Sequence, residues 1–172
     1  MQSKQMILAL MLCLALATPS LANPADVAPA EQQAVEEATT QFYSSLNELF
    51  TGDVAPMLDI WSHSTDVTFM GPAGGIEVGW EQVRALWESQ AALNLGGKVL
   101  PEDIHTTIGQ DLAVVICQEV GNNVDAAGEP IQVSIRATNV FRKENGQWKL
   151  IGHHTDLLPF LEQISVSTPN AE

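Results

Sequence analysis

The sequence has few positive charges for its length. It contains 7 lysine and arginine residues against 21 aspartate and glutamate residues, which gives a formal net charge of −14 at pH 7. A surface this acidic repels phosphate groups, so it argues against nucleic acid and anionic membranes as partners. We therefore expect no nucleic-acid partner.

Cysteine is also scarce, with only Cys13 and Cys117 present. Cys13 falls within an apolar N-terminal stretch, which leaves Cys117 without an intramolecular disulfide partner and excludes a cysteine-based metal cluster. The residues before Cys117 are Leu-Ala-Val-Val-Ile. This apolar run predicts a buried, unreactive strand residue, because burial in apolar surroundings raises the pKa of a thiol.

Long apolar runs are absent except near the N-terminus. Met6 to Ala17 is an unbroken apolar run of 12 residues, too short to span a bilayer as a helix. Lys4 precedes it, and Ser20 and Ala22 are small residues at the −3 and −1 positions of a cleavage site. The pattern predicts a signal peptide over residues 1–22, a periplasmic or secreted protein and no membrane partner after cleavage. An uncleaved anchor or a buried helix is the alternative.

The sequence after residue 22 predicts a flexible leader over 23–30, one domain over 31–160 and a C-terminal tail over 161–172. Apolar residues at spacings of three and four indicate helices first, and β-type runs then indicate strands. Helices followed by antiparallel strands favour the α+β class. The expected helices span 31–50, 54–61 and 80–95, and the expected strands span 66–70, 99–108, 112–120, 131–143 and 147–157.

Several segments in this order resemble a known family. They include Asp66-Val-Thr-Phe-Met-Gly-Pro, Gly79-Trp-Glu-Gln-Val-Arg and Asn145-Gly-Gln-Trp-Lys-Leu-Ile-Gly-His-His-Thr-Asp. From about residue 35 to 157 the chain resembles the SnoaL-like branch of the NTF2-like, or ketosteroid-isomerase-like, superfamily. The resemblance implies a cone-shaped fold, in which a strongly bent antiparallel sheet wraps around the N-terminal helices and encloses a pocket. It also implies a homodimer formed through the outer face of the sheet.

Strand alternation sorts the polar side chains that could serve such a pocket. Arg136 and Thr138 share one face of their strand, and His154 and Asp156 share one face of the next. The resemblance places both faces toward the cavity. Arg136 could then bind a carboxylate with its planar guanidinium, although a structural ion pair with Asp156 is the alternative.

A histidine in the pocket could transfer protons. His154 is one candidate general acid or base, with Asp156 or Thr138 fixing its tautomer, and His105 on an earlier strand is another. A hydrogen-bonded core histidine is the alternative for His154. We expect no metal, because the adjacent His153 and His154 point to opposite faces of a strand and no metal-ligand spacing is present. We expect no cofactor either, because the sequence contains no phosphate loop or dinucleotide fingerprint.

Aromatic residues could line the pocket. Trp61, Phe69 and Trp87 are candidates for an apolar wall around a ring-shaped ligand, with plain core packing as the alternative. Three functions stay open: binding of a small apolar or weakly anionic molecule without turnover, a cofactor-free lyase or isomerase reaction using His154 or His105, and a dimeric assembly domain with a vestigial pocket. The fold alone does not choose among these functions.

Overall fold

The computed structural model describes residues 27–72, 74–125 and 127–156. The predicted signal peptide (1–22) and tail (161–172) lie outside these ranges, so export stays a prediction. Three helices and one six-stranded sheet form the domain, which confirms the α+β cone fold. No helix in the described ranges is both long and apolar enough to cross a membrane.

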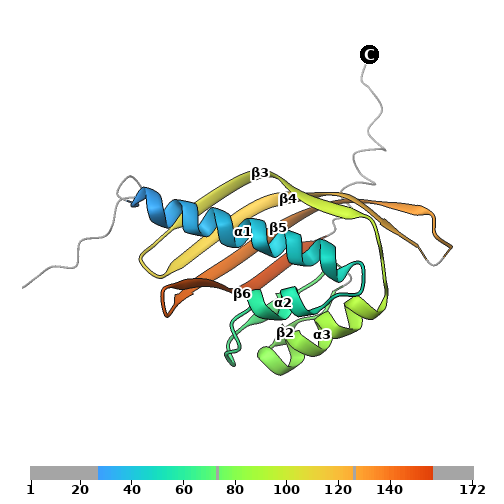
Figure 1. The fold of residues 1–172 in the computed structure, drawn as a ribbon, viewed down its shortest axis with the longest axis horizontal. Helices are drawn as coiled ribbons and strands as arrows, with labels where there is room; N and C mark the ends of the chain where they lie inside the picture. Colours follow the sequence, from blue (N-terminus) through green and yellow to red (C-terminus); the bar gives the residue numbers. More distant parts are fainter. Residues whose placement is uncertain (1–26, 73, 126, 157–172) are drawn as a thin grey trace, which may run out of the picture.

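The long helix α1 (Pro29–Leu49) runs across the sheet (Figure 1). Proline near its first position suits a helix start, since that residue needs no amide hydrogen bond there. Its apolar residues recur every three or four positions and face the core. At its C-terminal end the Asn47 amide exchanges two hydrogen bonds with the Val99 backbone, at 2.8 and 2.9 Å, which ties α1 to an edge strand.

Two shorter helices extend this layer beside the end of the sheet (Figure 1). Helix α2 spans Ala55–Ile60 and α3 spans Trp80–Ala92. Buried residues of α3 are spaced four apart, at Val83, Trp87 and Ala91. They join the residues of α1 and the sheet in one hydrophobic core.

The sheet has the strand order β2-β1-β6-β5-β4-β3. It differs in one point from the expected antiparallel sheet, because β1 reaches the free edge of β6 running parallel to it. The tight turn at Asn145 and Gly146, both with positive φ, forms the predicted hairpin between the last two strands. The strands are β1 (Thr68–Met70), β2 (Glu77–Val78), β3 (Lys98–Ile108), β4 (Leu112–Val124), β5 (Pro130–Glu144) and β6 (Gln147–Asp156).

One extra residue in β6 changes which side chains face the helices. Between two paired positions, Val140–Gly152 and Phe141–Leu150, β6 contains one residue more than β5. The extra residue is Ile151, and it makes a β-bulge. A bulge breaks the two-residue alternation of a strand, so the residues beyond it exchange faces.

Burial on either side of the bulge follows this exchange. Trp148 and Leu150 are buried before it, whereas His153 and Thr155 are buried after it. His154, between these two, is exposed on the outer face. A strand without the bulge would bury His154 and expose His153.

We predict that Gly97→Ala destabilises the fold by at least about 2 kcal/mol more than Gly128→Ala. Both glycines have positive φ, so both alanines carry similar backbone strain. A Cβ at Gly97 would lie 2.0 Å from the Asn122 carbonyl oxygen of β4, whereas one at Gly128 meets nothing within 4 Å. Urea unfolding measures the difference, and equal losses would contradict the close approach of β3 and β4.

Candidate functional site

The three predicted wall residues lie together in the core. Trp61, Phe69 and Trp87 are 1, 8 and 3% exposed. The Trp87 ring centroid lies 6.2 Å from that of Trp61 and 4.9 Å from that of Phe69. Phe69 also pairs in register with His153 and shares its face of the sheet.

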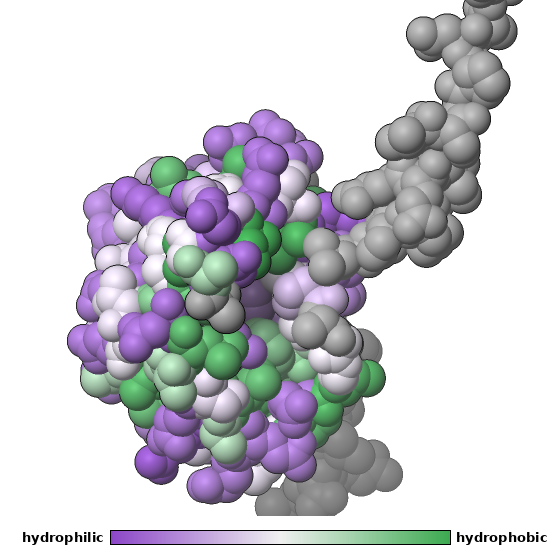
Figure 2. Space-filling model, turned by 90° about the vertical axis from the view of Figure 1, so that its right-hand side faces the viewer, coloured by the Kyte–Doolittle hydropathy of each residue, from purple (hydrophilic) through white to green (hydrophobic). Residues whose placement is uncertain are grey.

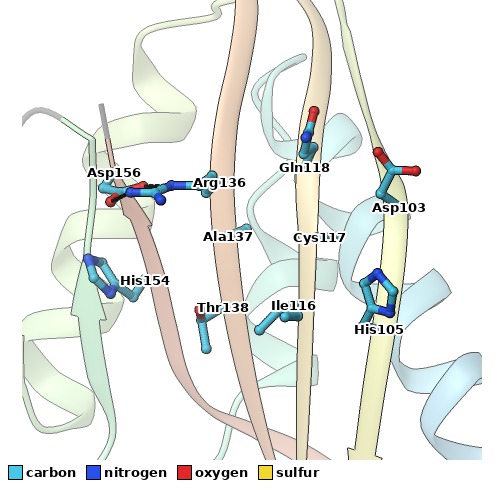
Figure 3. Close-up of a pocket in the computed structure, with 10 residues that line it drawn as sticks. All are labelled: Asp103, His105, Ile116, Cys117, Gln118, Arg136, Ala137, Thr138, His154 and Asp156. Atoms are coloured by element: carbon cyan, nitrogen blue, oxygen red, sulfur yellow. Dashed lines mark hydrogen bonds and ion pairs between the residues drawn. The ribbon is translucent and has the colours of Figure 1, made fainter. Parts of the chain in front are cut away.

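The predicted polar residues lie together as well, but on the outer face of the sheet. Arg136 pairs with Asp156, and Thr138 pairs with His154. These four and His105 line a pocket of about 400 Å³ across β3 to β6 (Figure 3). In Figure 3, His105 and His154 stand at opposite sides of this pocket.

The expectation that Arg136 and His154 share a pocket with the tryptophans is therefore wrong. The bulge at Ile151 turns His154 and Asp156 outward. In β5 the buried residues are Ala137, Asn139 and Phe141, so Arg136 and Thr138 face away from the helices. The sheet itself separates the polar residues from the aromatic wall.

The geometry favours the ion-pair alternative for Arg136. Its Nε and Nη2 atoms donate to the Asp156 carboxylate at 3.1 and 2.6 Å. The hydrogen bonds to this guanidinium hold the pKa of Asp156 below its usual range. Because the Arg136 side chain is 63% exposed, the pair is screened by water and contributes little to stability.

A different polar cluster lies inside the domain, between α1 and the sheet. It consists of Tyr43 from α1, Glu119 from β4, Asn139 from β5 and His153 from β6. All four are at most 5% exposed. Burial of this many polar groups is costly unless they are paired. We name these four residues the inner cluster.

Hydrogen bonds join the inner cluster in a chain. His153 Nδ1 lies 2.6 Å from Asn139 Oδ1, and Asn139 Nδ2 donates to Tyr43 Oη at 3.1 Å. Tyr43 Oη donates to Glu119 Oε1 at 3.1 Å and also lies 3.0 Å from Cys117 Sγ. The chain nearly closes on itself, since Glu119 Oε1 is 3.9 Å from His153 Nε2.

Burial drives the two titratable ends of this chain toward their uncharged forms. It raises the pKa of Glu119 to about 7, against the opposing effect of the Tyr43 hydrogen bond. It lowers the pKa of His153 to about 3. Near neutral pH the cluster therefore holds an unprotonated imidazole beside a carboxyl group that gains or loses its proton, which is an arrangement suited to acid–base chemistry.

Sequence reasoning missed Glu119, although the sequence contained a signal for it. Glu119 is the only charged residue in the otherwise apolar and amide-bearing run from Leu112 to Val124. A lone charge in a central strand indicates a buried functional or paired group. Asn139 and His153 lie on the face of the sheet that packs against the helices, whereas the resemblance placed the opposite face, with Arg136 and His154, toward the cavity.

The described part of the chain contains no group of three or more histidine, cysteine, aspartate or glutamate side chains that could hold a metal ion. The inner cluster contributes one carboxyl, one imidazole and one phenol group, which can exchange protons and form hydrogen bonds.

Comparison with known families agrees with this architecture. A model of the SnoaL-like domain matches residues 35–157. The chain belongs to this family. The inner cluster thus lies inside a SnoaL-like domain, and the resemblance of residues 35–157 is confirmed. No curated protein matches the chain significantly.

Solved structures with the same fold carry varied descriptions. An NTF2-like candidate dehydratase from Streptomyces avermitilis is 22% identical, with a TM-score of 0.67 over 76% of this SnoaL-like chain and 99% of that one. A candidate calcium/calmodulin-dependent protein kinase type II association domain from Thiobacillus denitrificans is 24% identical, with a TM-score of 0.61 over 72% and 94%. A candidate aromatic ring hydroxylase from Novosphingobium aromaticivorans is 18% identical, with a TM-score of 0.65 over 77% and 92%. At these identities the likeness shows the fold alone.

We predict that Glu119→Gln gains stability relative to the wild type as the pH rises. Burial raises the pKa of Glu119 in the folded state to about 7, above its ordinary value of 4.5, so the wild type has a stability contribution that is complete below pH 4.5 and lost by about pH 7. The glutamine variant lacks this loss, so the difference in unfolding free energy grows by up to about 3 kcal/mol between pH 4.5 and 8. The opposite contribution of His153 is common to both proteins.

Urea unfolding at several pH values measures this difference, with the exposed Glu102→Gln as the matched control. The control should follow the wild type at every pH. A Glu119→Gln curve parallel to that of the wild type would contradict the buried, protonated carboxyl.

Proposed function

We propose that this SnoaL-like domain binds a small, uncharged, ring-shaped molecule against Glu119 and His153. The observation that carries the proposal is a carboxyl and a neutral imidazole buried 3.9 Å apart beneath aromatic rings. The two groups make no direct hydrogen bond at that distance. Tyr43 bonds only one oxygen of Glu119 and Asn139 only one ring nitrogen of His153, so these bonds offset part of the burial cost. A ligand that contacts both groups would offset more of it.

Other buried polar groups support a ligand on this side of the sheet. The indole N–H groups of Trp61 and Trp87 and the hydroxyl of Thr155 are buried without a hydrogen-bond partner among the described residues. They could donate to a carbonyl or hydroxyl oxygen of the ligand. Figure 2 shows a hollow in the end of the molecule that bears α3 and the β4–β5 hairpin, and we propose this hollow as the entrance.

The charges of the domain favour a neutral ligand over an anionic one. None of the lysine and arginine side chains in the described ranges is buried, and Arg136 lies on the outer face. The expectation of a weakly anionic ligand depended on Arg136 in the pocket, so its basis is lost. An anion beside Glu119 would be desolvated in a low-dielectric interior without a buried cation among the described residues to pair with it.

Acid–base catalysis is the second candidate function. The pKa of Glu119, raised to about 7, lets this group donate a proton near neutral pH, and the unprotonated His153 can accept one. Such a pair suits a cofactor-free lyase or isomerase reaction, with His153 in the role expected for His154. If the domain catalyses such a reaction, its rate should change with pH near 7, where Glu119 gains or loses its proton.

The outer face suits assembly rather than ligand capture. Three apolar side chains of β4, Leu112, Val114 and Ile116, are 37 to 47% exposed there. One of the structures similar to this chain is described as an association domain. We propose that two copies of the chain pack through this face and bury these side chains.

We predict that His153→Ala weakens ligand binding and His154→Ala does not, because only His153 lies on the inner face of β6. With 2-naphthol as a neutral probe, His153→Ala should weaken binding at least about tenfold, because it removes a partner of the buried site. His154→Ala should leave binding unchanged. The anion 2-naphthoate should bind the wild type at least about tenfold more weakly than 2-naphthol, since no buried cation meets it.

Tryptophan fluorescence quenching measures each affinity. Equal losses in the two variants, or saturable binding that neither affects, would contradict the inner site. Preference for 2-naphthoate would contradict the neutral ligand class.

We predict that Ile116→Glu raises the dissociation constant of the homodimer at least about tenfold, because it places a charge in the buried interface. Leu93→Glu, at a position 59% exposed after α3, should leave the dimer intact. Size-exclusion chromatography with light scattering reports the mass. A monomeric wild type, or a dimer that tolerates both changes, would contradict assembly through the sheet.

A further inference from the structure

We infer that Asn139 is a positioning residue that holds the proton of His153 on Nδ1 and leaves Nε2 bare toward Glu119. Neutral histidine has two tautomers, and the partner of one ring nitrogen decides which is present. The inference deepens the proposed function and rests on it only in taking Nε2 as the atom that meets the ligand.

The contact between Asn139 and His153 fixes which ring nitrogen carries the proton. Their Oδ1 and Nδ1 atoms are 2.6 Å apart, which is hydrogen-bond distance. A carbonyl oxygen can only accept, so the imidazole must donate from Nδ1. A neutral imidazole with its proton on Nδ1 has none on Nε2.

Tyr43 fixes the orientation of the Asn139 amide from the side opposite His153. Asn139 Nδ2 donates to Tyr43 Oη, so the single phenolic proton stays available for Glu119 Oε1. Each contact between these residues then contains one proton. All three contacts, at 2.6, 3.1 and 3.1 Å, are satisfied together.

The reversed amide satisfies fewer groups. Its Nδ2 would face His153 Nδ1 and force the proton onto Nε2. That proton would point toward Glu119 Oε1 across 3.9 Å, which is too far for a hydrogen bond. An N–H group buried without a partner costs more than a bare nitrogen, so the first orientation is favoured.

His153 Nε2 and the Glu119 carboxyl group therefore have opposite hydrogen-bonding roles. Bare Nε2 of His153 accepts a hydrogen bond, and the protonated Glu119 donates one. Together they are complementary to a neutral hydroxyl group, which can donate to the imidazole and accept from the carboxyl group. Within the class of uncharged ring molecules, this favours hydroxyl-bearing ligands such as phenols and cyclic alcohols.

Nuclear magnetic resonance of the full chain labelled with ¹⁵N-histidine tests the tautomer directly. Long-range proton–nitrogen correlations distinguish a protonated Nδ1 from a protonated Nε2, and a His153→Ala sample assigns the signal among the four histidines. We predict that wild-type His153 carries its proton on Nδ1. Asn139→Leu, which removes the acceptor at similar size, should shift the tautomer ratio at least about fivefold toward Nε2.

Matched controls separate positioning from general damage. Thr138→Val, on the outer face beside Asn139, should leave the His153 signal unchanged. Tyr43→Phe removes the anchor of the amide and should shift the ratio in the same direction as Asn139→Leu. This second variant decides the matter if the leucine variant does not fold.

A wild-type His153 protonated on Nε2 would overturn the inference. An unchanged tautomer ratio in the folded Asn139→Leu protein, or in Tyr43→Phe where the leucine variant does not fold, would overturn it equally. The test is independent of ligand binding. If the tautomer is found as inferred but 2-naphthol does not bind, the proposed function fails and the positioning role stands.

Discussion

The β-bulge at Ile151 is the constraint on which the two faces of this domain depend. Without it, β6 would alternate without interruption from Trp148 to Asp156, and His154 would face the helices. With it, Trp148 and Leu150 complete the core at one end of the strand and His153 enters the interior at the other. One inserted residue thus decides which of two adjacent histidines lies beside Glu119.

The same strands therefore offer two different environments. On the inner face, burial removes water and makes the charged forms of Glu119 and His153 unfavourable, so small changes in contact move protons. On the outer face, Arg136 and Asp156 keep their charges because solvent reaches them. The inner face therefore supports the proposed proton chemistry, and the exposed apolar side chains of β4 support the proposed association through the outer face.

The helices and strands could be predicted well from the sequence, but the side of the sheet on which each polar side chain lies could be predicted less well. Helical spacing located α1 and α3, and Asn145-Gly146 located the last hairpin. The bulge could not be predicted, because isoleucine is a common strand residue. Only the pairing of β6 with β5 shows that Ile151 is the additional residue. The prediction that Arg136 points into the cavity failed for another reason. Family resemblance determines the fold more firmly than the direction of a single side chain.

Stability alone does not explain the inner cluster. Apolar side chains of similar size at Glu119 and His153 would fill the same space without the cost of desolvating a carboxyl and an imidazole, and replacements of this kind often stabilise proteins. Tyr43 and Asn139 offset only part of that cost, since they bond one atom of each group and leave Nε2 of His153 3.9 Å from the carboxyl oxygen. A hydroxyl placed against both would supply the missing partner to each. The cost of burying Glu119 and His153 is therefore an argument for the proposed binding of a hydroxyl-bearing ligand between them.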